Sequence, residues 1–328
     1  MKISIALAAM LFCCTAAMAQ NASTQTVAAQ PPAQPPMPVV TLPSPLPATL
    51  AELVPAITAK VSTANVEFAI ADLADPQHPV FAGFNETIPI YPASVIKVPI
   101  LVAAYTKAEN DPAFLEQVVT IEHKNFTETW DPLAENGIHD PDPAIREGDK
   151  LKVSFLLHVM ISRSDNIATN TMIDLLGRPN INALMEKLGY EKTRVYRKVY
   201  GETPLDDPEE AHWSDRSNIF PPGEAVRMLA EIYAGKIASP ASCKAMMSPL
   251  LNQLDRELVA AVLPKDAVYA GKTGETSKVL HDIDIVTGPH RRYALAVYTN
   301  HHDRPARVID IHMVGAMVDA YFTAQYEK

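Results

Sequence analysis

The sequence is short of cysteine, and this scarcity limits how its fold can be stabilised. Only three cysteines occur in 328 residues, and two of them, Cys13 and Cys14, lie in an apolar N-terminal segment. If that segment is removed, Cys243 is left alone and no intrachain disulfide can form, so stability must come from a packed core. A lone cysteine in a helical stretch is typical of a small core residue, and we interpret Cys243 in this way.

An excess of positive charge is also absent. The chain has 28 lysines and arginines against 38 aspartates and glutamates, which gives a net charge of -10. A nucleic-acid-binding protein would present a basic face, so we expect no nucleic-acid partner. The hydrophobic fraction of 48% and the charged fraction of 20% are ordinary for a globular protein.

Beyond its N-terminus the sequence has no long apolar run. Residues 1–19 have the pattern of a secretory signal peptide, with an early lysine, an apolar stretch and a small-residue cleavage site near Ala19. A transmembrane anchor is an alternative, although the run is short for a bilayer. A lipoprotein is another, because Cys13 and Cys14 lie there, although Phe12 is bulky for a lipid-attachment site. We expect an exported protein, periplasmic or secreted, without stable membrane insertion.

Composition divides the remaining chain into two parts. Residues 20–47 are rich in proline, alanine and glutamine, and they cannot bury enough apolar surface to fold, so we predict a disordered tether. Residues 48–328 are predicted to form one globular domain without internal repeats.

The order of the predicted elements indicates the fold class. Strands are predicted near both ends of the domain, and a helical block lies between them. We therefore predict an α+β fold in which N- and C-terminal strands share one antiparallel sheet, flanked by helices, with an all-helical lobe and the active site in the cleft between them. The predicted strands are 67–74, 78–85, 267–274, 281–287 and 291–300; the predicted helices begin near Ala48 and cover 94–107, 151–161, 166–176, 181–188, 222–234, 241–252 and 308–326.

A serine and a lysine lie three residues apart in the sequence SVIK. If Ser94 begins a helix, Lys97 lies on the same face one turn later. A partly buried lysine can lose its proton and act as a base for a serine nucleophile, and a helix N-terminus directs N–H groups at developing negative charge. An N-cap serine beside a solvated lysine is the ordinary alternative for an isolated match.

The tripeptide Ser164-Asp165-Asn166 lies between two predicted helices. In a cleft, its hydroxyl can relay a proton and its carboxamide can hold a substrate amide. A helix start is the alternative, because serine and aspartate are good N-caps.

The tripeptide Lys272-Thr273-Gly274 lies on a predicted strand. Its lysine and threonine can offer a cation and a hydroxyl to a carboxylate, and its glycine lets a substrate backbone approach closely. A hairpin turn is the alternative for a single motif of this kind.

These three motifs, in this order and roughly 70 and 108 residues apart, resemble the signature of class A β-lactamases and the penicillin-recognising serine hydrolase family. The flanking sequence agrees, because an apolar helix precedes the second motif and HDIDIV follows the third as the next strand would. The resemblance covers about residues 48–328 and implies a β-lactamase-like transpeptidase fold.

The resemblance implies a set of catalytic groups. Ser94 would be acylated by a β-lactam carbonyl, and Lys97 would accept the proton from Ser94. Ser164 would relay that proton to the leaving nitrogen. The oxyanion hole would be the backbone N–H groups of Ser94 and Glu275.

The resemblance also implies a set of substrate-binding groups. Asn166 would bind the acylamide side chain, and Lys272 and Thr273 would hold the substrate carboxylate, with Gly274 beside them. The family often adds an arginine at this end of the substrate. The corresponding place in this chain is close to His281, so that role is either unfilled or taken by another residue such as Arg304 or Arg307.

Class A enzymes hydrolyse the acyl-enzyme with a loop glutamate in a pattern like E-x-x-L-N. Here Glu202 fits that pattern if Asp206 replaces the asparagine, and residues 193–197 resemble the start of the loop. About three additional residues precede Glu202, and Glu209, Glu210 or a merely exposed acid are alternatives. A second carboxylate beside Glu202 would raise one of the two pKa values.

The leading prediction is therefore a serine β-lactamase that acylates Ser94 and hydrolyses the acyl-enzyme, as in β-lactam catabolism and antibiotic resistance. A D,D-peptidase or transpeptidase acting on peptidoglycan is one alternative, and a penicillin-binding sensor that stays acylated is another. We expect a monomer with a small β-lactam or peptidoglycan-like substrate and no cofactor. We expect no metal either, because adjacent His301 and His302 rarely converge on one ion and the zinc-enzyme pattern H-x-H-x-D is absent.

Overall fold

The computed structural model describes residues 43–126, 145–199 and 216–326, all of them in the unit Ala33–Lys328. The predicted signal peptide and residues 20–42 of the predicted tether lie outside this part of the chain. Among the described helices, none has both the length and the apolarity needed to span a bilayer.

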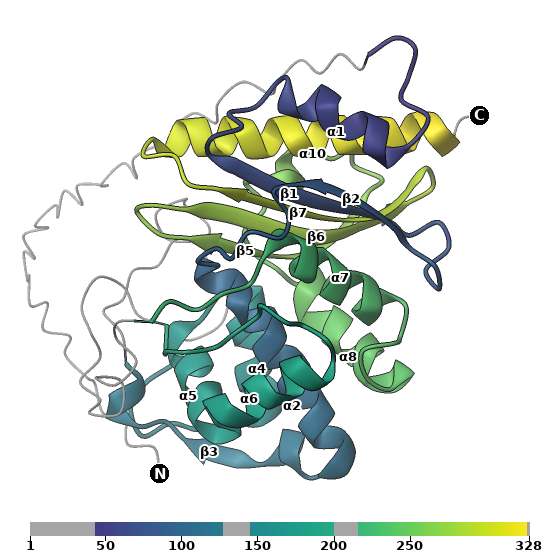
Figure 1. Ribbon diagram of the computed structural model, residues 1–328. Coiled ribbons are helices and arrows are strands. Elements are labelled where there is room, and N and C mark those ends of the chain that lie inside the picture. The colour runs from purple at the N-terminus through teal and green to yellow at the C-terminus, as the bar shows by residue number, and fades with distance from the viewer. Residues whose placement is uncertain (1–42, 127–144, 200–215, 327–328) are drawn as a thin grey trace, which may run out of the picture. The chain divides into compact units, whose positions relative to one another are not determined.

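A five-stranded antiparallel sheet forms the centre of the fold (Figure 1). Two N-terminal strands and three C-terminal strands build it in the order β2-β1-β7-β6-β5, which confirms the predicted α+β class and leaves β5 at an edge. The strands are β1 (Val66–Asp72), β2 (Val80–Phe84), β5 (Val268–Glu275), β6 (Leu280–Gly288) and β7 (Arg291–Thr299).

The two faces of the sheet bury different side chains. Because side chains alternate along a strand, β7 presents Leu295 and Val297 to one core and Ala294 and Ala296 to the other. The larger side chains pack under the helices α1 (Leu50–Thr58), α9 (Val259–Val262) and α10 (Arg304–Tyr326). The alanines let α7 (Pro222–Tyr233) lie close to the opposite face (Figure 1).

The helical lobe surrounds one apolar helix, α2 (Lys97–Asn110). Its first eight residues, through Ala104, are all buried, as expected for a helix enclosed on every side. The short helix η1 (Ala93–Ile96) leads into it and packs on β5 and β6. The helices around α2 are α4 (Val153–Ser162), α5 (Asn166–Leu176), α6 (Arg178–Lys187) and α8 (Pro240–Leu251). Cys243 is buried in α8, which confirms its interpretation as a core residue.

Several boundaries differ from those predicted. The helix predicted from residue 151 begins at Val153, because β4 (Lys150–Lys152) pairs with β3 (Val118–Thr120). The helix predicted from residue 181 begins at Arg178, because a proline fits the first turn of a helix. Likewise, α10 begins four residues before the predicted start. The short helices η2 (Phe114–Glu116) and η3 (His123–Asn125) were not predicted.

Candidate active site

Ser94 lies in η1, one turn before Lys97 at the start of α2. The serine is partly exposed, whereas Lys97 has no exposed surface. The residue before the serine, Ala93, has a φ of 45°, in the left-handed region that side chains with a Cβ rarely adopt. Such a conformation costs about 1–3 kcal/mol and is found most often at functional sites.

The Lys97 amine is held by the second motif. Its Nζ lies 2.6 Å from the carbonyl oxygen of Ser164, 3.0 Å from the Ser164 hydroxyl and 2.8 Å from Oδ1 of Asn166. Burial lowers the pKa of Lys97 well below its ordinary value, and the nearby charge of Lys272 lowers it further. A neutral amine fits these contacts, because it can donate to the carbonyl and the amide oxygen and accept from the hydroxyl.

The second motif begins helix α5, which confirms its interpretation as a helix start. Asp165 is the N-cap of α5, where its carboxylate accepts a hydrogen bond of 2.7 Å from the N–H of Ala168. The residues on either side of this cap, Ser164 and Asn166, contact Lys97. Ser164 has a φ of 62°, so a second non-glycine residue of the candidate site has left-handed backbone.

The third motif lies on the edge strand β5, as predicted. Lys272 is fully buried, and burial lowers its pKa to about 7. Gly274 lies against the backbone before Ser94: a Cβ on this glycine would come within 3.0 Å of the Pro92 carbonyl oxygen and the Ser94 nitrogen. Any larger residue would have to push this backbone away by a few tenths of an ångström. The backbones that carry the two predicted oxyanion donors, Ser94 and Glu275, therefore lie next to each other.

His281 fixes the same backbone from β6, where it is paired with Gly274. Its Nε2 donates to the Tyr91 carbonyl oxygen at 3.0 Å, and its Nδ1 accepts from the N–H of Thr299 at 3.3 Å. Burial lowers the pKa of His281 to about 4, so the ring is neutral and its two bonds define one tautomer. His281 therefore positions the segment before Ser94, a contribution that the sequence did not suggest.

The loop predicted to carry the water-activating glutamate is closed at its base. Arg194 and Ile219 form an isolated bridge, and the side-chain oxygen of Asn218 accepts from the N–H groups of Tyr196 and Arg197. The predicted base itself, Glu202, lies outside the described residues, as do the alternatives Glu209 and Glu210 and the neighbouring Asp206.

Asn170 ties this loop to α5. Its Oδ1 accepts from the N–H of Val199 at 2.8 Å, and its Nδ2 donates to the carbonyl oxygens of Val199 and Asn125. Asn170 was not predicted as a site residue, although its position one helical turn after Asn166 places it on the same face of the helix.

The two arginines considered for substrate binding are engaged elsewhere. Arg304 forms ion pairs with Glu257 and Glu275. Arg307 is buried, and its Nη1 donates to the carbonyl oxygen of Thr276 at 3.0 Å. The place near His281 is filled by the neutral ring described above.

The adjacent histidines do not converge. His301 Nε2 lies 2.7 Å from Asp310 Oδ2, whereas His302 is exposed. In the described ranges, no three histidine, cysteine, aspartate or glutamate side chains are arranged to hold a metal ion.

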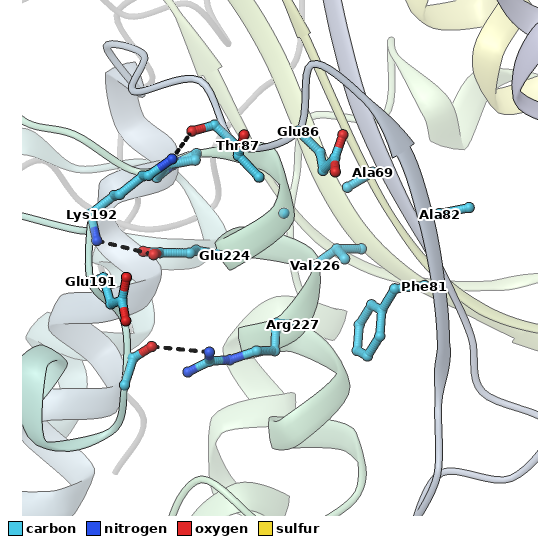
Figure 2. Close-up of a pocket in the computed structure, with 13 residues that line it drawn as sticks. Ala69, Phe81, Ala82, Glu86, Thr87, Glu191, Lys192, Glu224, Val226 and Arg227 are labelled. Atoms are coloured by element: carbon cyan, nitrogen blue, oxygen red, sulfur yellow. Dashed lines mark hydrogen bonds between the residues drawn. The ribbon is translucent and has the colours of Figure 1, made fainter. Parts of the chain in front are cut away.

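A cavity of about 480 Å³ lies apart from all of these residues, and none of the predicted site residues lines it (Figure 2). Its polar groups are largely paired with one another. Glu224 accepts from the N–H of Lys192, the Lys192 amine donates to the Thr87 carbonyl, and Arg227 donates to the Gly189 carbonyl. We therefore assign no chemistry to this cavity.

Comparison with known proteins supports the likeness in sequence and fold. The beta-lactamase enzyme family matches residues 48–322 of the chain. No curated protein matches it.

Solved structures match most of the chain. A beta-lactamase from Sphaerobacter thermophilus DSM 20745 has 24% identity and a TM-score of 0.67, over 82% of this chain and 94% of that one. The protein PBP-A has 25% identity and a TM-score of 0.68, over 87% and 100% of the two chains. A mutant of PBP-A, solved as an acyl-enzyme complex with penicillin G, has 23% identity and a TM-score of 0.69, over 84% and 97%.

Proposed function

Because the chain belongs to the beta-lactamase enzyme family, we propose that it is a class A-like serine hydrolase that acylates Ser94 with a β-lactam and hydrolyses the acyl-enzyme. One observation carries this proposal: the Lys97 amine is buried one helical turn from Ser94 and contacts both Ser164 and Asn166. Neither a solvated lysine nor a simple helix cap would be arranged in this way.

Acylation uses the Lys97 amine and the Ser164 hydroxyl, which lie 3.0 Å apart, together with Ser94 one helical turn before Lys97. The neutral Lys97 amine takes the proton of the Ser94 hydroxyl, and Oγ adds to the carbonyl carbon of the lactam. The carbon–nitrogen bond then breaks. The leaving nitrogen takes the proton of the Ser164 hydroxyl, which regains one from Lys97. The products are an ester on Ser94 and an amine, with Lys97 neutral again.

Deacylation needs a second base. We propose that Glu202 takes a proton from water, whose oxygen adds to the ester carbonyl. The bond to Ser94 Oγ then breaks, Ser94 takes back the proton, and the product leaves as a carboxylic acid. The closure of the loop at Arg194 and Ile219 supports this role, because it fixes the loop on both sides of Glu202.

The substrate-binding roles follow the same arrangement. We propose that the backbone N–H groups of Ser94 and Glu275 bind the oxyanion, since the contact of Gly274 with Ser94 brings their backbones together. Loss of one such donor typically lowers the rate about 10²–10³-fold. Asn166 is proposed to bind the acylamide group, and Lys272 and Thr273 the group beyond the scissile bond.

Intact-mass spectrometry after addition of penicillin G tests the proposal. We expect a covalent adduct with the mass of one penicillin, which forms and then decays. The Ser94→Ala variant should show no such adduct. Absence of any adduct on the unchanged protein, together with absence of turnover, would refute the proposed function.

The loop base has its own test. In Glu202→Gln the adduct should accumulate, because acylation is retained while water activation is lost, and Glu209→Gln is the matched control. If Glu202→Gln turns over at the rate of the unchanged protein, the assignment of the base is wrong.

The same time course separates the alternative functions. An adduct that never decays favours an acylated sensor, a possibility supported by the likeness to the PBP-A mutant solved as an acyl-enzyme. Release of D-alanine from a peptidoglycan stem peptide favours a D,D-peptidase.

We also propose that residues 1–19 direct export to the periplasm or the medium, that residues 20–47 are a tether and that residues 48–328 form one catalytic domain. N-terminal sequencing of the secreted protein tests the cleavage near Ala19.

A further inference from the structure

Several acidic side chains lie close to Thr273 of the third motif. Thr273 and Glu275 lie two residues apart on β5, so their side chains share one face of the strand. Asp282 of β6 is the cross-strand neighbour of Thr273 and lies on the same face. The Thr273 hydroxyl is already hydrogen-bonded to the carboxyl of Asp255.

The arginine at this position, Arg304, is already paired with two glutamates. Arg304 donates from Nε and Nη2 to the two oxygens of Glu275, at 2.6 and 3.2 Å. It also donates from Nη1 and Nη2 to the two oxygens of Glu257, at 3.1 and 3.0 Å. Two carboxylates around one guanidinium give this cluster a net charge of -1. A substrate carboxylate at Arg304 therefore competes with two glutamates, which already accept four of its five N–H groups.

The remaining cations do not compensate for this charge. Lys272 is fully buried, and its amine donates to the Thr273 carbonyl oxygen at 2.6 Å. Arg307 is 3% exposed and donates to the carbonyl oxygen of Thr276. The ionisable groups near Thr273 are four acids, Asp255, Glu257, Glu275 and Asp282, and three bases, Lys272, Arg304 and Arg307. Burial raises the pKa of Asp255 and raises that of Asp282 to about 7, so the fixed negative charge of this region lies mainly on the two glutamates.

From these contacts we infer that Glu275, paired with Arg304, makes this subsite select against a free carboxylate and in favour of a neutral or cationic group. Glu275 is then a specificity residue through its side chain, in addition to its proposed backbone role. The inference rests on the proposed function, because it concerns substrates that acylate Ser94.

Three forms of one β-lactam test it. Penicillin G carries a carboxylate, its methyl ester is neutral there, and its diethylaminoethyl ester is cationic. The second-order rate constant for acylation of Ser94 is measured for each by intact mass. In the unchanged protein we expect the methyl ester and the cationic ester to react faster than the acid.

Two variants should change the ratio of the acylation rate constants, acid over methyl ester, in opposite directions. Glu275→Gln removes a negative charge beside the subsite and should raise the ratio about five- to tenfold. Arg304→Gln leaves both glutamates without their cation and should lower it. General damage to the fold would slow both probes and shift the ratio in the same direction in the two variants. Glu116→Gln removes a carboxylate from an exposed ion pair with Lys152 and should leave the ratio unchanged.

The outcomes separate this inference from the proposal on which it rests. If no probe acylates the unchanged protein, the proposed function fails and the inference fails with it. If Ser94 is acylated but the acid reacts faster than both esters, or Glu275→Gln does not change the ratio, only the inference is overturned.

Discussion

The buried carboxyl group of Asp284 should make the protein less stable as the pH rises, and the substitution Asp284→Asn tests this. Asp284 of β6 has no exposed surface, and neither of its carboxylate oxygens has a hydrogen-bond partner within the part of the chain that the structure describes. Asp282 lies two residues away on the same face of the strand. Burial raises the pKa of Asp284 well above its ordinary value, and the charge of Asp282 raises it further.

The sign of the effect follows from this raised pKa. Below the unfolded-state pKa of about 3.9, Asp284 is neutral in both states and carries no penalty for ionisation. Above that pH the unfolded state ionises first, so the free energy of unfolding falls by about 1.4 kcal/mol per pH unit until the folded-state pKa is reached. Asparagine has nearly the same shape and does not ionise. Asp284→Asn should therefore match the parent near pH 4 and gain on it as the pH rises, by at most about 1.4 kcal/mol per pH unit.

Urea unfolding at intervals between pH 4 and pH 7, followed by tryptophan fluorescence, measures this difference. Asp111→Asn is the control, because it removes an exposed carboxylate at the end of α2 and should give a difference that does not grow with pH. If the stability difference for Asp284→Asn is the same at pH 4 and pH 6, or the variant is less stable at pH 6, the reasoning is refuted.

Three further predictions concern the site. Gly274→Ala should slow acylation at least tenfold, because its Cβ would push on the backbone at Ser94; stopped-flow acylation measures this, and an unchanged rate contradicts the close approach. Asn170→Ala should lower the free energy of unfolding by about 1–3 kcal/mol, since the N–H of Val199 loses its acceptor, and should slow deacylation more than acylation; equal effects on both steps would contradict a role in holding the loop. Lys97→Arg should slow acylation about 10²–10⁴-fold and remove its rise with pH, because arginine stays charged; a retained pH profile would identify another base.

Periodic patterns in the sequence predicted most of the fold. The alternating strand around Lys272 and the apolar helix after Ser94 were both found where they were expected, because burial on one face or on all faces fixes the pattern of residues. Short elements were missed. Strands β3 and β4 have three residues each, too few to show any period, and they exist because they pair with each other.

The candidate site was predictable only where it consists of local motifs. Ser94, Lys97 and Asn166 were named from short patterns, and the structure brings them together. The ion pairs of Arg304 join residues 29 and 47 positions away, and sequence spacing carries no signal for such contacts. For the same reason the positioning role of His281, which depends on strand register, was not foreseen.

The buried charges beneath the site follow from one physical requirement. Lys97 can act as a base only if it is removed from water, and the elements that bury it also bury Lys272, whose charge lowers the pKa of Lys97 further. The nearest acids, Asp165 for Lys97 and Asp255 and Asp282 for Lys272, act in the opposite sense. Asp282 favours the charged form of Lys272, so replacing Asp282 by asparagine should lower the pKa of Lys272 below about 7.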